Sequence, residues 1–466
     1  MRIAFPRRLM TFKRTFYLVL WSGFCILLGV VLALYAESLL LFLILFAIAG
    51  FLVFMAMDFA LYLMLICLPF SLRYILPSQM EVLSPTEPLL GMLVVTFFVK
   101  QILARTIKIG SPAQESDRFP LTLPILFYIA ATFLPTFNSP EVVVSAKGAI
   151  RSTAYVMLSF LGYALIRNRQ DLRRLFVSTF PSASVAVLWT SIVLVYHIDQ
   201  WRWTSAYYGS PFTHYSVYGS FTAVFLFIAV SRLLLDRTPY DRVLWTILLI
   251  IFGVGMLLCF SRGVWMSMII TTGFLLMQIG VGEQHKKILL IGAILVFVLV
   301  VLSLPGISDL VLQQIATVFN LQFASNKSRL LRWGQAFIMF LQHPIIGNGY
   351  GAFAMLYREN TSLVGVHTAQ FQLGAHNEYL QVLAELGLVG FAAWLWIIIA
   401  FFRCGLRGLS QIADDFYRSL IIGLMTAELS MLVLFTVNSL PHGDELAVPF
   451  WLIYGLLPAV VNMANR

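Results

Sequence analysis

The sequence predicts an all-α polytopic membrane protein with 12 to 14 transmembrane helices. Of its 466 residues, 60% are apolar and only 11% are charged, whereas soluble domains carry about 25% charged residues. The apolar residues are gathered into long runs, and a transmembrane helix needs about 20 such residues. A water-soluble fold is excluded, because so few polar groups could not cover a globule of this size.

Polar breaks divide the apolar stretches into fourteen candidate spans. The first follows a basic segment and is too long for the apolar part of a signal peptide, so we expect it to be retained. The spans are predicted near residues 16–35, 38–56, 59–76, 88–104, 120–136, 152–166, 175–196, 214–234, 243–260, 264–282, 288–304, 386–402, 418–437 and 447–463.

The basic residues predict the orientation in the membrane. With a cytoplasmic N-terminus, 22 of the 31 lysines and arginines fall on the inner side, as the preference of cytoplasmic loops for positive charge requires. Both termini are therefore expected to be cytoplasmic. The excess of base is explained by topology, so no nucleic-acid partner is expected. The nine outer basic residues are Arg73, Lys147, Arg151, Arg202, Arg262, Lys327, Arg329, Arg332 and Arg358.

One long outer segment divides the chain into three parts. Residues 1–304 form the N-terminal transmembrane helices, residues 305–385 a large outer loop, and residues 386–466 the C-terminal transmembrane helices. In the loop, residues 306–325 have a helical apolar face suited to lying on the bilayer. A second helix is predicted at 329–341, followed by a glycine-rich turn, and a third leads from about Asn377 into the next span.

Two arginines of the loop share one face of the second predicted helix. Arg329 and Arg332 are three residues apart and Gln335 follows after three more, a spacing that puts the three side chains on one stripe. Guanidinium groups bind phosphate oxygens through paired hydrogen bonds. The alternative is a basic rim that reaches towards lipid headgroups.

Three further outer residues are candidates for a site. Arg262 lies in a tight turn between two spans, where a charge is costly unless it is paired or faces water. Arg202 lies between two tryptophans, an arrangement that fits a ligand contact or an interfacial aromatic belt equally. His376 has a side chain that can take up a proton near neutral pH, although a lone histidine also fits a structural role.

No metal site is expected. His367 and His376 are nine residues apart, no His-x-x-x-His motif occurs, and the adjacent Asp414 and Asp415 belong to the cytoplasmic side. The glycines of residues 347–351 match neither a P-loop nor a dinucleotide fingerprint and form a turn instead. We therefore expect metal-independent chemistry without a cofactor.

The second half of the chain carries several motifs in a definite order. A Ser-Arg-Gly turn follows a span, two motifs lie in the outer loop, and the last motif is His, Asn, two residues, Leu, six residues and Gly. They are Ser261-Arg262-Gly263, Ser328-Arg329-Leu330-Leu331-Arg332-Trp333-Gly334-Gln335-Ala336, Pro344-Ile345-Ile346-Gly347-Asn348-Gly349-Tyr350-Gly351, and His376-Asn377-Glu378-Tyr379-Leu380 with Gly387. Over about residues 261–390 this pattern resembles the O-antigen ligase and polymerase superfamily.

The resemblance implies a glycosyltransferase of lipopolysaccharide biosynthesis with a GT-C-like helical architecture. It would act at the periplasmic face of the bacterial inner membrane on a glycan carried by undecaprenyl diphosphate. In ligases the acceptor is a sugar hydroxyl of the lipid A core, and in polymerases it is the end of another lipid-linked repeat. The partners expected are therefore this donor, one of these acceptors and the membrane lipids.

The family's essential residues correspond to Arg262, Arg329 and His376, the second because Trp333 follows it by four residues; Arg332 is the alternative. Two arginines can stabilise the charge that builds on a diphosphate leaving group without a cation, and a histidine suits the general base. We expect an inverting, in-line displacement.

The same reasoning adds secondary contacts to the diphosphate or the rest of the substrate. Arg332, Arg202, Gln335 and Asn377 are the side chains expected to make them.

Three alternatives to a ligase are considered. A polymerase of the same superfamily shares this loop chemistry, although the His-Asn-x-x-Leu motif favours a ligase. A lipid-linked oligosaccharide flippase should concentrate charges near the bilayer midplane, where Asp58 and Glu428 are the only carboxylates. A peptidoglycan glycosyltransferase of the shape, elongation, division and sporulation type relies on an outer-loop carboxylate, and none stands out here.

Overall fold

A computed structural model describes ten stretches of the chain and a few single positions between residues 308 and 320. The stretches are residues 39–75, 81–107, 119–197, 209–212, 214–235, 239–279, 284–303, 322–360, 374–439 and 443–466. The first predicted span, Arg202 and most of the predicted amphipathic segment 306–325 lie outside the described residues.

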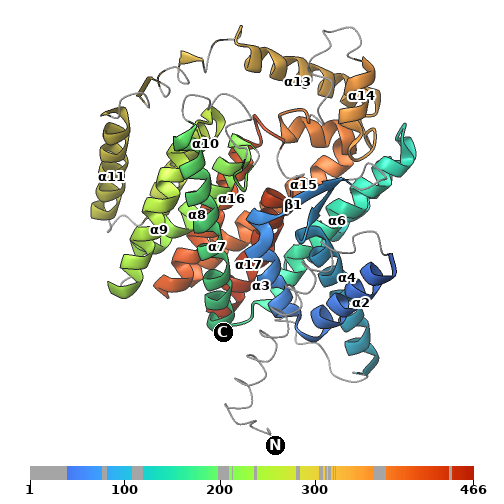
Figure 1. Cartoon of the computed structure of the whole chain (residues 1–466), viewed down its shortest axis with the longest axis horizontal. Helices are drawn as coiled ribbons and strands as arrows, with labels where there is room; N and C mark the ends of the chain where they lie inside the picture. Colours follow the sequence, from blue (N-terminus) through green and yellow to red (C-terminus); the bar gives the residue numbers. More distant parts are fainter. Residues whose placement is uncertain are drawn as a thin grey trace, which may run out of the picture. The chain divides into compact units, whose positions relative to one another are not determined.

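Contacts divide the chain into two units (Figure 1). The first comprises Met1–Leu65 with Arg73–Pro112, and the second Ile66–Leu72 with Ala113–Arg466. In the first unit, α2 packs on α4, and a two-stranded sheet lies beside α4. The elements of this part are α2 (Leu39–Met55), α3 (Met57–Cys67), β1 (Leu72–Ile75), β2 (Glu81–Ser84) and α4 (Thr86–Ile107).

The second unit is a helical bundle. Its elements are η1 (Leu68–Phe70), α5 (Thr122–Phe133), η3 (Leu134–Asn138), α6 (Val142–Leu165), α7 (Arg169–Tyr196), α8 (Tyr215–Leu235), α9 (Pro239–Leu258), α10 (Arg262–Gln278), α11 (Gln284–Ser303), α13 (Ala324–Gln342), α14 (Ala352–Asn360), α15 (Glu378–Gln411), α16 (Asp415–Leu434) and α17 (Asp444–Ala464). Figure 1 shows α13 and α14 together at one end of these helices.

Helices α8, α16 and α17 form the core of the second unit. Helix α16 packs on α8, α10 and α17, and α17 packs on α6. Small residues allow these close approaches: a Cβ on Gly423 would lie 3.1 Å from the Ile228 Cα, and a Cβ on Gly455 would overlap the Ser159 carbonyl. Such residues are typical of transmembrane helix interfaces, because they let backbones approach closely.

The helical class predicted from the sequence is confirmed. Every predicted span after the first overlaps a helix, although the bounds differ. Six helices of the described part are long and apolar enough to cross a membrane, or seven if a pair bent by 116° at Ala56 counts as one span. The full number of 12 to 14 spans stays a prediction.

The short sheet is the exception to the all-helical prediction. The span predicted at 59–76 ends early as a helix, because Pro69 at the start of η1 provides no N–H for further helical hydrogen bonds. The chain then enters β1.

One of the nine basic residues predicted on the outer side forms an ion pair within the protein. Arg151 of α6 forms an ion pair with Asp444 of α17, with 3.7 Å between nitrogen and oxygen, and Asp444 is fully buried. This ion pair joins α6 and α17, which pack extensively on each other.

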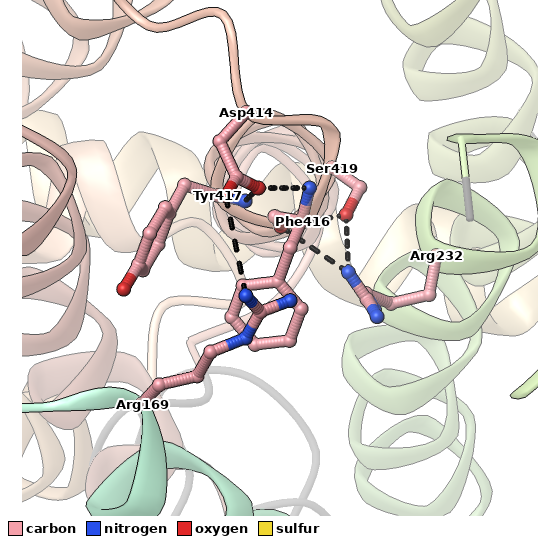
Figure 2. Close-up of polar contacts among 6 residues, drawn as sticks. All are labelled: Arg169, Arg232, Asp414, Phe416, Tyr417 and Ser419. Carbon is pink, nitrogen blue, oxygen red and sulfur yellow. Dashed lines mark hydrogen bonds and ion pairs between the residues drawn. The ribbon is translucent and has the colours of Figure 1, made fainter. Parts of the chain in front are cut away.

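Near the C-terminal end of α8, the ring of Phe416 contacts two arginines (Figure 2). The guanidinium carbon of Arg169 lies 3.9 Å from the ring centre and that of Arg232 lies 4.4 Å from it. Arg232 is buried and donates to the Phe416 carbonyl at 3.2 Å and to the Ser419 hydroxyl at 2.7 Å. Asp414 pairs with Arg169 at 4.0 Å. This cluster connects α7, α8 and α16.

Replacing Phe416 should loosen this junction. We expect Phe416→Leu to lower the free energy of unfolding by about 1 to 2 kcal/mol, because a cation–π contact contributes about that much when it is desolvated. The measurement is thermal unfolding of the purified protein in detergent. Tyr417→Leu is the matched control, since its ring lies 5.9 Å from Arg169. Equal losses in the two variants would contradict this role of Phe416.

Candidate active site

Helix α13 presents its charged face to the protein and its apolar face outwards. Arg332 is only 4% exposed and Arg329 is half-buried, whereas Phe337 and Leu341 are 52% and 59% exposed. The arginines share one face as their spacing predicted, and the helix begins earlier than expected, at Ala324. Ala336 and Met339 are buried too, but the stripe with Phe337 and Leu341 is exposed and apolar, as in a helix that lies at a membrane surface.

The indole of Trp333 connects this charged face to His376. Its Nε1–H donates to the His376 carbonyl at 3.3 Å. His376 itself has a φ of 53°, a left-handed conformation that is rare for residues other than glycine and clusters at functional sites. Trp333, one of the motif residues, therefore sets the position of the histidine backbone relative to the two arginines.

The residues after His376 are bound to the end of α16. Asn377 donates from its backbone to the Ser439 hydroxyl at 3.2 Å and from Nδ2 to the Thr436 carbonyl at 2.9 Å. The Glu378 N–H donates to the Phe435 carbonyl at 2.8 Å. Asn377 also caps α15, because its Oδ1 accepts from the Leu380 N–H at 3.0 Å.

Helix α15 breaks at Gly387, and the glycine-rich loop fills the break. Gly387 has φ 64° and ψ −166°. The N–H groups of Leu388 and Val389, which would bond within a regular helix, donate instead to the Pro344 and Ile345 carbonyls at 2.8 and 3.1 Å.

N–H groups of the loop also donate hydrogen bonds to carbonyl groups of α15. The Ala384 and Glu385 carbonyls, freed by the break, accept from the N–H groups of Asn348 and Gly349 at 3.2 and 3.0 Å. A Cβ on Gly347 would overlap the Glu385 carbonyl oxygen. The expected turn of residues 347–351 is therefore the segment that completes α15.

Glu385 connects the same loop to α14. Its Oε2 accepts from the Gly351 N–H at 2.9 Å and its Oε1 from the Phe353 N–H at 3.2 Å. A carboxylate at a helix N-terminus is favourable because it faces unpaired N–H groups. Neither α14 nor this contact was predicted from the sequence.

Arg262 begins α10 and is held by described residues of the outer loop that follows later in the chain. It donates from Nη1 to the Thr317 carbonyl at 2.7 Å and hydroxyl at 3.0 Å, and from Nη2 to Asn326 Oδ1 at 3.4 Å. Its guanidinium carbon lies 4.9 Å from the centre of the Phe323 ring. Several of its donors are thus engaged with the protein itself.

Arg332 is differently placed. Its guanidinium carbon lies 5.9 Å from the centre of the Tyr357 ring. Its Nε and Nη1 are buried and have no hydrogen-bond partner among the described residues. Buried guanidinium donors without partners are costly, so this side chain is suited to receive an anionic ligand.

Arg329 is the electrostatic centre of the cluster. Burial lowers the pKa of His214, Arg332 and His376, and the positive charge of Arg329 lowers each of them further. Arg262 also lies within electrostatic range of Arg329. Within the stretches that the structure describes, none of the three arginines forms an ion pair. The site therefore carries uncompensated positive charge.

Both histidines of the cluster are neutral at pH 7. Burial, with repulsion from Arg332 and Arg329, lowers the pKa of His376 to about 3. Burial and Arg329 lower the pKa of His214 to about 4. A neutral imidazole has one ring nitrogen able to accept a proton, so His376 is in the protonation state that a general base needs.

The structure places the other predicted site residues less directly. Gln335 lies half-buried on α13. Asn377 uses both ends of its side chain within the protein. Arg202 lies outside the described residues, so the binding roles of all three stay predictions.

His214 was not predicted from the sequence. It lies at the start of an apolar helix on the predicted outer side, yet belongs to no motif. Its Nδ1 accepts from the Ser216 N–H at 3.2 Å, and its ring lies against that of Tyr215, with 4.1 Å between centres. Only its polar character at the level of Arg262 and His376 distinguished it in the sequence.

In the described part of the chain, no three His, Cys, Asp or Glu side chains are grouped to hold a metal ion. The charge that a diphosphate needs is instead available from guanidinium groups, which form paired hydrogen bonds with phosphate oxygens. Metal-independent chemistry stays a proposal.

Comparison with known proteins agrees with the motifs. Residues 247–395 match the family model described as O-antigen ligase, and this range contains every motif residue from Ser261 to Gly387. The match supports the resemblance to the O-antigen ligase and polymerase superfamily over this part of the chain. A search of curated proteins finds no match.

The family and the apolar helices together support a bacterial membrane protein. The family match supports activity of the O-antigen ligase or polymerase type, with lipid-linked glycan and lipid A core as substrates in general terms. The arginine and histidine cluster lies within or beside the matched region.

The loop that fills the break should not tolerate a side chain at Gly347. Gly347 and Gly351 have φ of 81° and 77°, so alanine costs about 1 to 2 kcal/mol at either position. Only at Gly347 does the new Cβ overlap a backbone atom, whereas at Gly351 nothing lies within 4 Å. We expect Gly347→Ala to lose most activity and thermal stability and Gly351→Ala to keep most of both. Similar behaviour of the two variants would contradict the docking of this loop.

Proposed function

We propose that the protein is an O-antigen ligase. It transfers O-antigen or a related glycan from undecaprenyl diphosphate to a sugar hydroxyl of the lipid A core. The reaction takes place at the periplasmic face of the inner membrane, with both termini of the protein in the cytoplasm. The observation that carries the proposal is the cluster of Arg332, which is buried, with the half-buried Arg329 and Arg262, around a neutral His376.

The chemistry follows from these groups. The acceptor hydroxyl oxygen attacks the anomeric carbon of the donor and forms the new glycosidic bond. The bond from that carbon to the diphosphate oxygen breaks, and undecaprenyl diphosphate leaves with the electron pair. His376 takes the hydroxyl proton as general base. Attack opposite to the leaving group inverts the anomeric carbon.

The arginines act on the leaving group. Arg329 and Arg332 provide donors from one face of α13, and Arg262 provides the third guanidinium from α10. Donors fixed before the reaction stabilise the charge that develops on the diphosphate without reorganising. The uncompensated positive charge supports an anionic substrate and makes a metal ion unnecessary in this proposal.

Donor binding also prepares the base. In the free protein, Arg332 and Arg329 help to hold the pKa of His376 at about 3, where the imidazole is neutral but weakly basic. Burial is the larger cause of this lowered pKa and stays in place, but a diphosphate between these arginines cancels part of their charge, so the pKa of His376 rises above its value in the free protein. The imidazole then accepts a proton more readily when the donor is bound.

A polymerase of the same superfamily is the second candidate. It would use the same cluster and the same proton transfer, with the end of another lipid-linked repeat as the acceptor. The His376-Asn377-x-x-Leu380 motif favours a ligase, and the acceptor distinguishes the two activities.

The first test replaces the cluster residues in cells. We expect Arg329→Ala and His376→Ala to abolish attachment of O-antigen to core while lipid-linked polymer accumulates, as shown by lipopolysaccharide gels. Lys327→Ala is the matched control, because this basic side chain is exposed on the same helix. Core carrying a single repeat would identify a polymerase instead. Full attachment in either cluster variant would contradict the role given to that residue.

The second test is the pH dependence of the purified enzyme. A general base is lost as the pH falls through its pKa. The kcat/KM reports the free enzyme and kcat the substrate complex. With a pKa of about 3 for His376 in the free protein, kcat/KM should not fall between pH 7 and about 5. The acid limb of kcat should lie at higher pH than the acid limb of kcat/KM, because bound diphosphate raises that pKa. If kcat and kcat/KM fell at the same pH on the acid side, the proposed effect of donor binding on the pKa of His376 would be contradicted.

A further inference from the structure

The guanidinium of Arg262 is bound along one of its edges. Its Nη1 donates to both oxygens of Thr317, at 2.7 and 3.0 Å, and its Nη2 donates to Asn326 Oδ1 at 3.4 Å. The two acceptor residues are joined as well, because Asn326 Nδ2 donates to the Thr317 carbonyl at 3.0 Å. Their acceptors therefore lie side by side, along the edge that Nη1 and Nη2 form.

A second edge of the same guanidinium is left for a ligand. It consists of the Nε–H and the other N–H of Nη2, which donate to no acceptor in the part of the chain that the structure describes. A guanidinium binds a phosphate through two parallel hydrogen bonds from such an edge. The Phe323 ring, 4.9 Å from the guanidinium carbon, lies against the group and restricts its rotation.

The amide of Asn326 has one orientation that satisfies all of its contacts. Its Nδ2 donates to the carbonyls of Thr317 and Asn320 at 3.0 and 2.9 Å, which uses both N–H groups of a carboxamide. Its Oδ1 is then the atom that accepts from Arg262. With oxygen and nitrogen exchanged, an oxygen would face two carbonyls and an NH₂ group would face the guanidinium. The two carbonyls thus fix the acceptor that Arg262 meets.

The backbone end of Arg262 is fixed independently. It begins α10, which packs on α16, and a Cβ on the next residue, Gly263, would lie 2.9 Å from Val437 Cγ2. Phe260, two residues earlier, has a φ of 47°, a conformation rare for residues other than glycine. An arginine held at both ends has lost its rotamer freedom before a ligand arrives, which favours binding.

We propose that Asn326 is a positioning residue of the site: with Thr317 it holds the guanidinium of Arg262 so that the edge formed by Nε and Nη2 binds two oxygens of the donor diphosphate. The inference rests on the proposed function, since it states how one of the proposed arginines presents its donors. Asn326 precedes Arg329 by three residues on α13, so one helix turn carries Arg329 and also holds Arg262.

The experiment measures binding of undecaprenyl diphosphate to the purified full-length protein in detergent, by isothermal titration calorimetry. Arg262→Ala should weaken binding about tenfold to a hundredfold, because hydrogen bonds to charged groups are lost. Asn326→Leu should weaken it about threefold to tenfold. The guanidinium remains in that variant, but it has to be ordered at the moment of binding.

The double variant tests whether Asn326 acts through Arg262. In the Arg262→Ala background, Asn326→Leu should weaken binding by less than about twofold more, because no guanidinium remains to be positioned; coupled residues show this departure from additivity. The same factor of loss in both backgrounds would show that Asn326 supports α13 in general, and would overturn the proposal.

Gln322→Leu is the matched control. Gln322 is an exposed amide of the same segment, and its backbone N–H donates to Asn320 Oδ1 at 3.0 Å, a bond that leucine retains. This variant should bind undecaprenyl diphosphate as tightly as the unchanged protein.

Unchanged binding in Asn326→Leu or in Arg262→Ala would also overturn the proposal. If Asn326→Leu fails to fold, Asn326→Asp takes its place in both backgrounds. Its carboxylate cannot donate to the two carbonyls and competes with the diphosphate for Arg262, so binding should weaken at least about threefold, and full binding would contradict the proposal.

Arg329→Ala separates this inference from the proposed function. Unchanged binding in Arg329→Ala would remove the diphosphate site itself. Weakened binding in Arg329→Ala and Arg262→Ala, together with full binding in Asn326→Leu, would remove only the role of Asn326.

Discussion

A helix that breaks in mid-course leaves N–H and C=O groups without their regular partners, and buried groups of this kind must be satisfied elsewhere. The break of α15 at Gly387 meets this requirement by exchanging four backbone hydrogen bonds with residues 344–349. The exchange holds the outer segment against the helix that begins beside His376. Because Glu385 then binds the start of α14, most of the described loop depends on this break.

The second constraint is electrostatic. Three arginines and two neutral histidines share a partly buried region in which no described acidic side chain pairs with the arginines. Such a cluster is unfavourable in isolation, because like charges repel and burial removes their solvation. A protein retains an arrangement of this kind where an anionic ligand repays the cost. The motif residues and the physical properties of the site thus agree.

Much of this site could be predicted from the sequence, because its residues lie in local patterns. The spacing of Arg329 and Arg332 placed them on one helix face, and the turn around Arg262 placed it at a helix end. Trp333 was noted only as a motif residue, and its hydrogen bond to the His376 carbonyl came from the structure. His214 was not predicted, because no local pattern connects a single polar residue to His376 more than a hundred positions away.

By itself, the sequence determined the helical membrane class, the positions of the helices and the resemblance to the O-antigen ligase and polymerase superfamily, since these depend on composition, apolar runs and short motifs. The tertiary structure decided that Arg262 is engaged by Thr317 and Asn326, that Arg332 has buried donors without described partners, and that Trp333 bonds to the His376 carbonyl. These contacts join segments far apart in the chain. Their existence depends on how α10, α13, α15 and α16 pack, and helix packing is not encoded in any single local pattern.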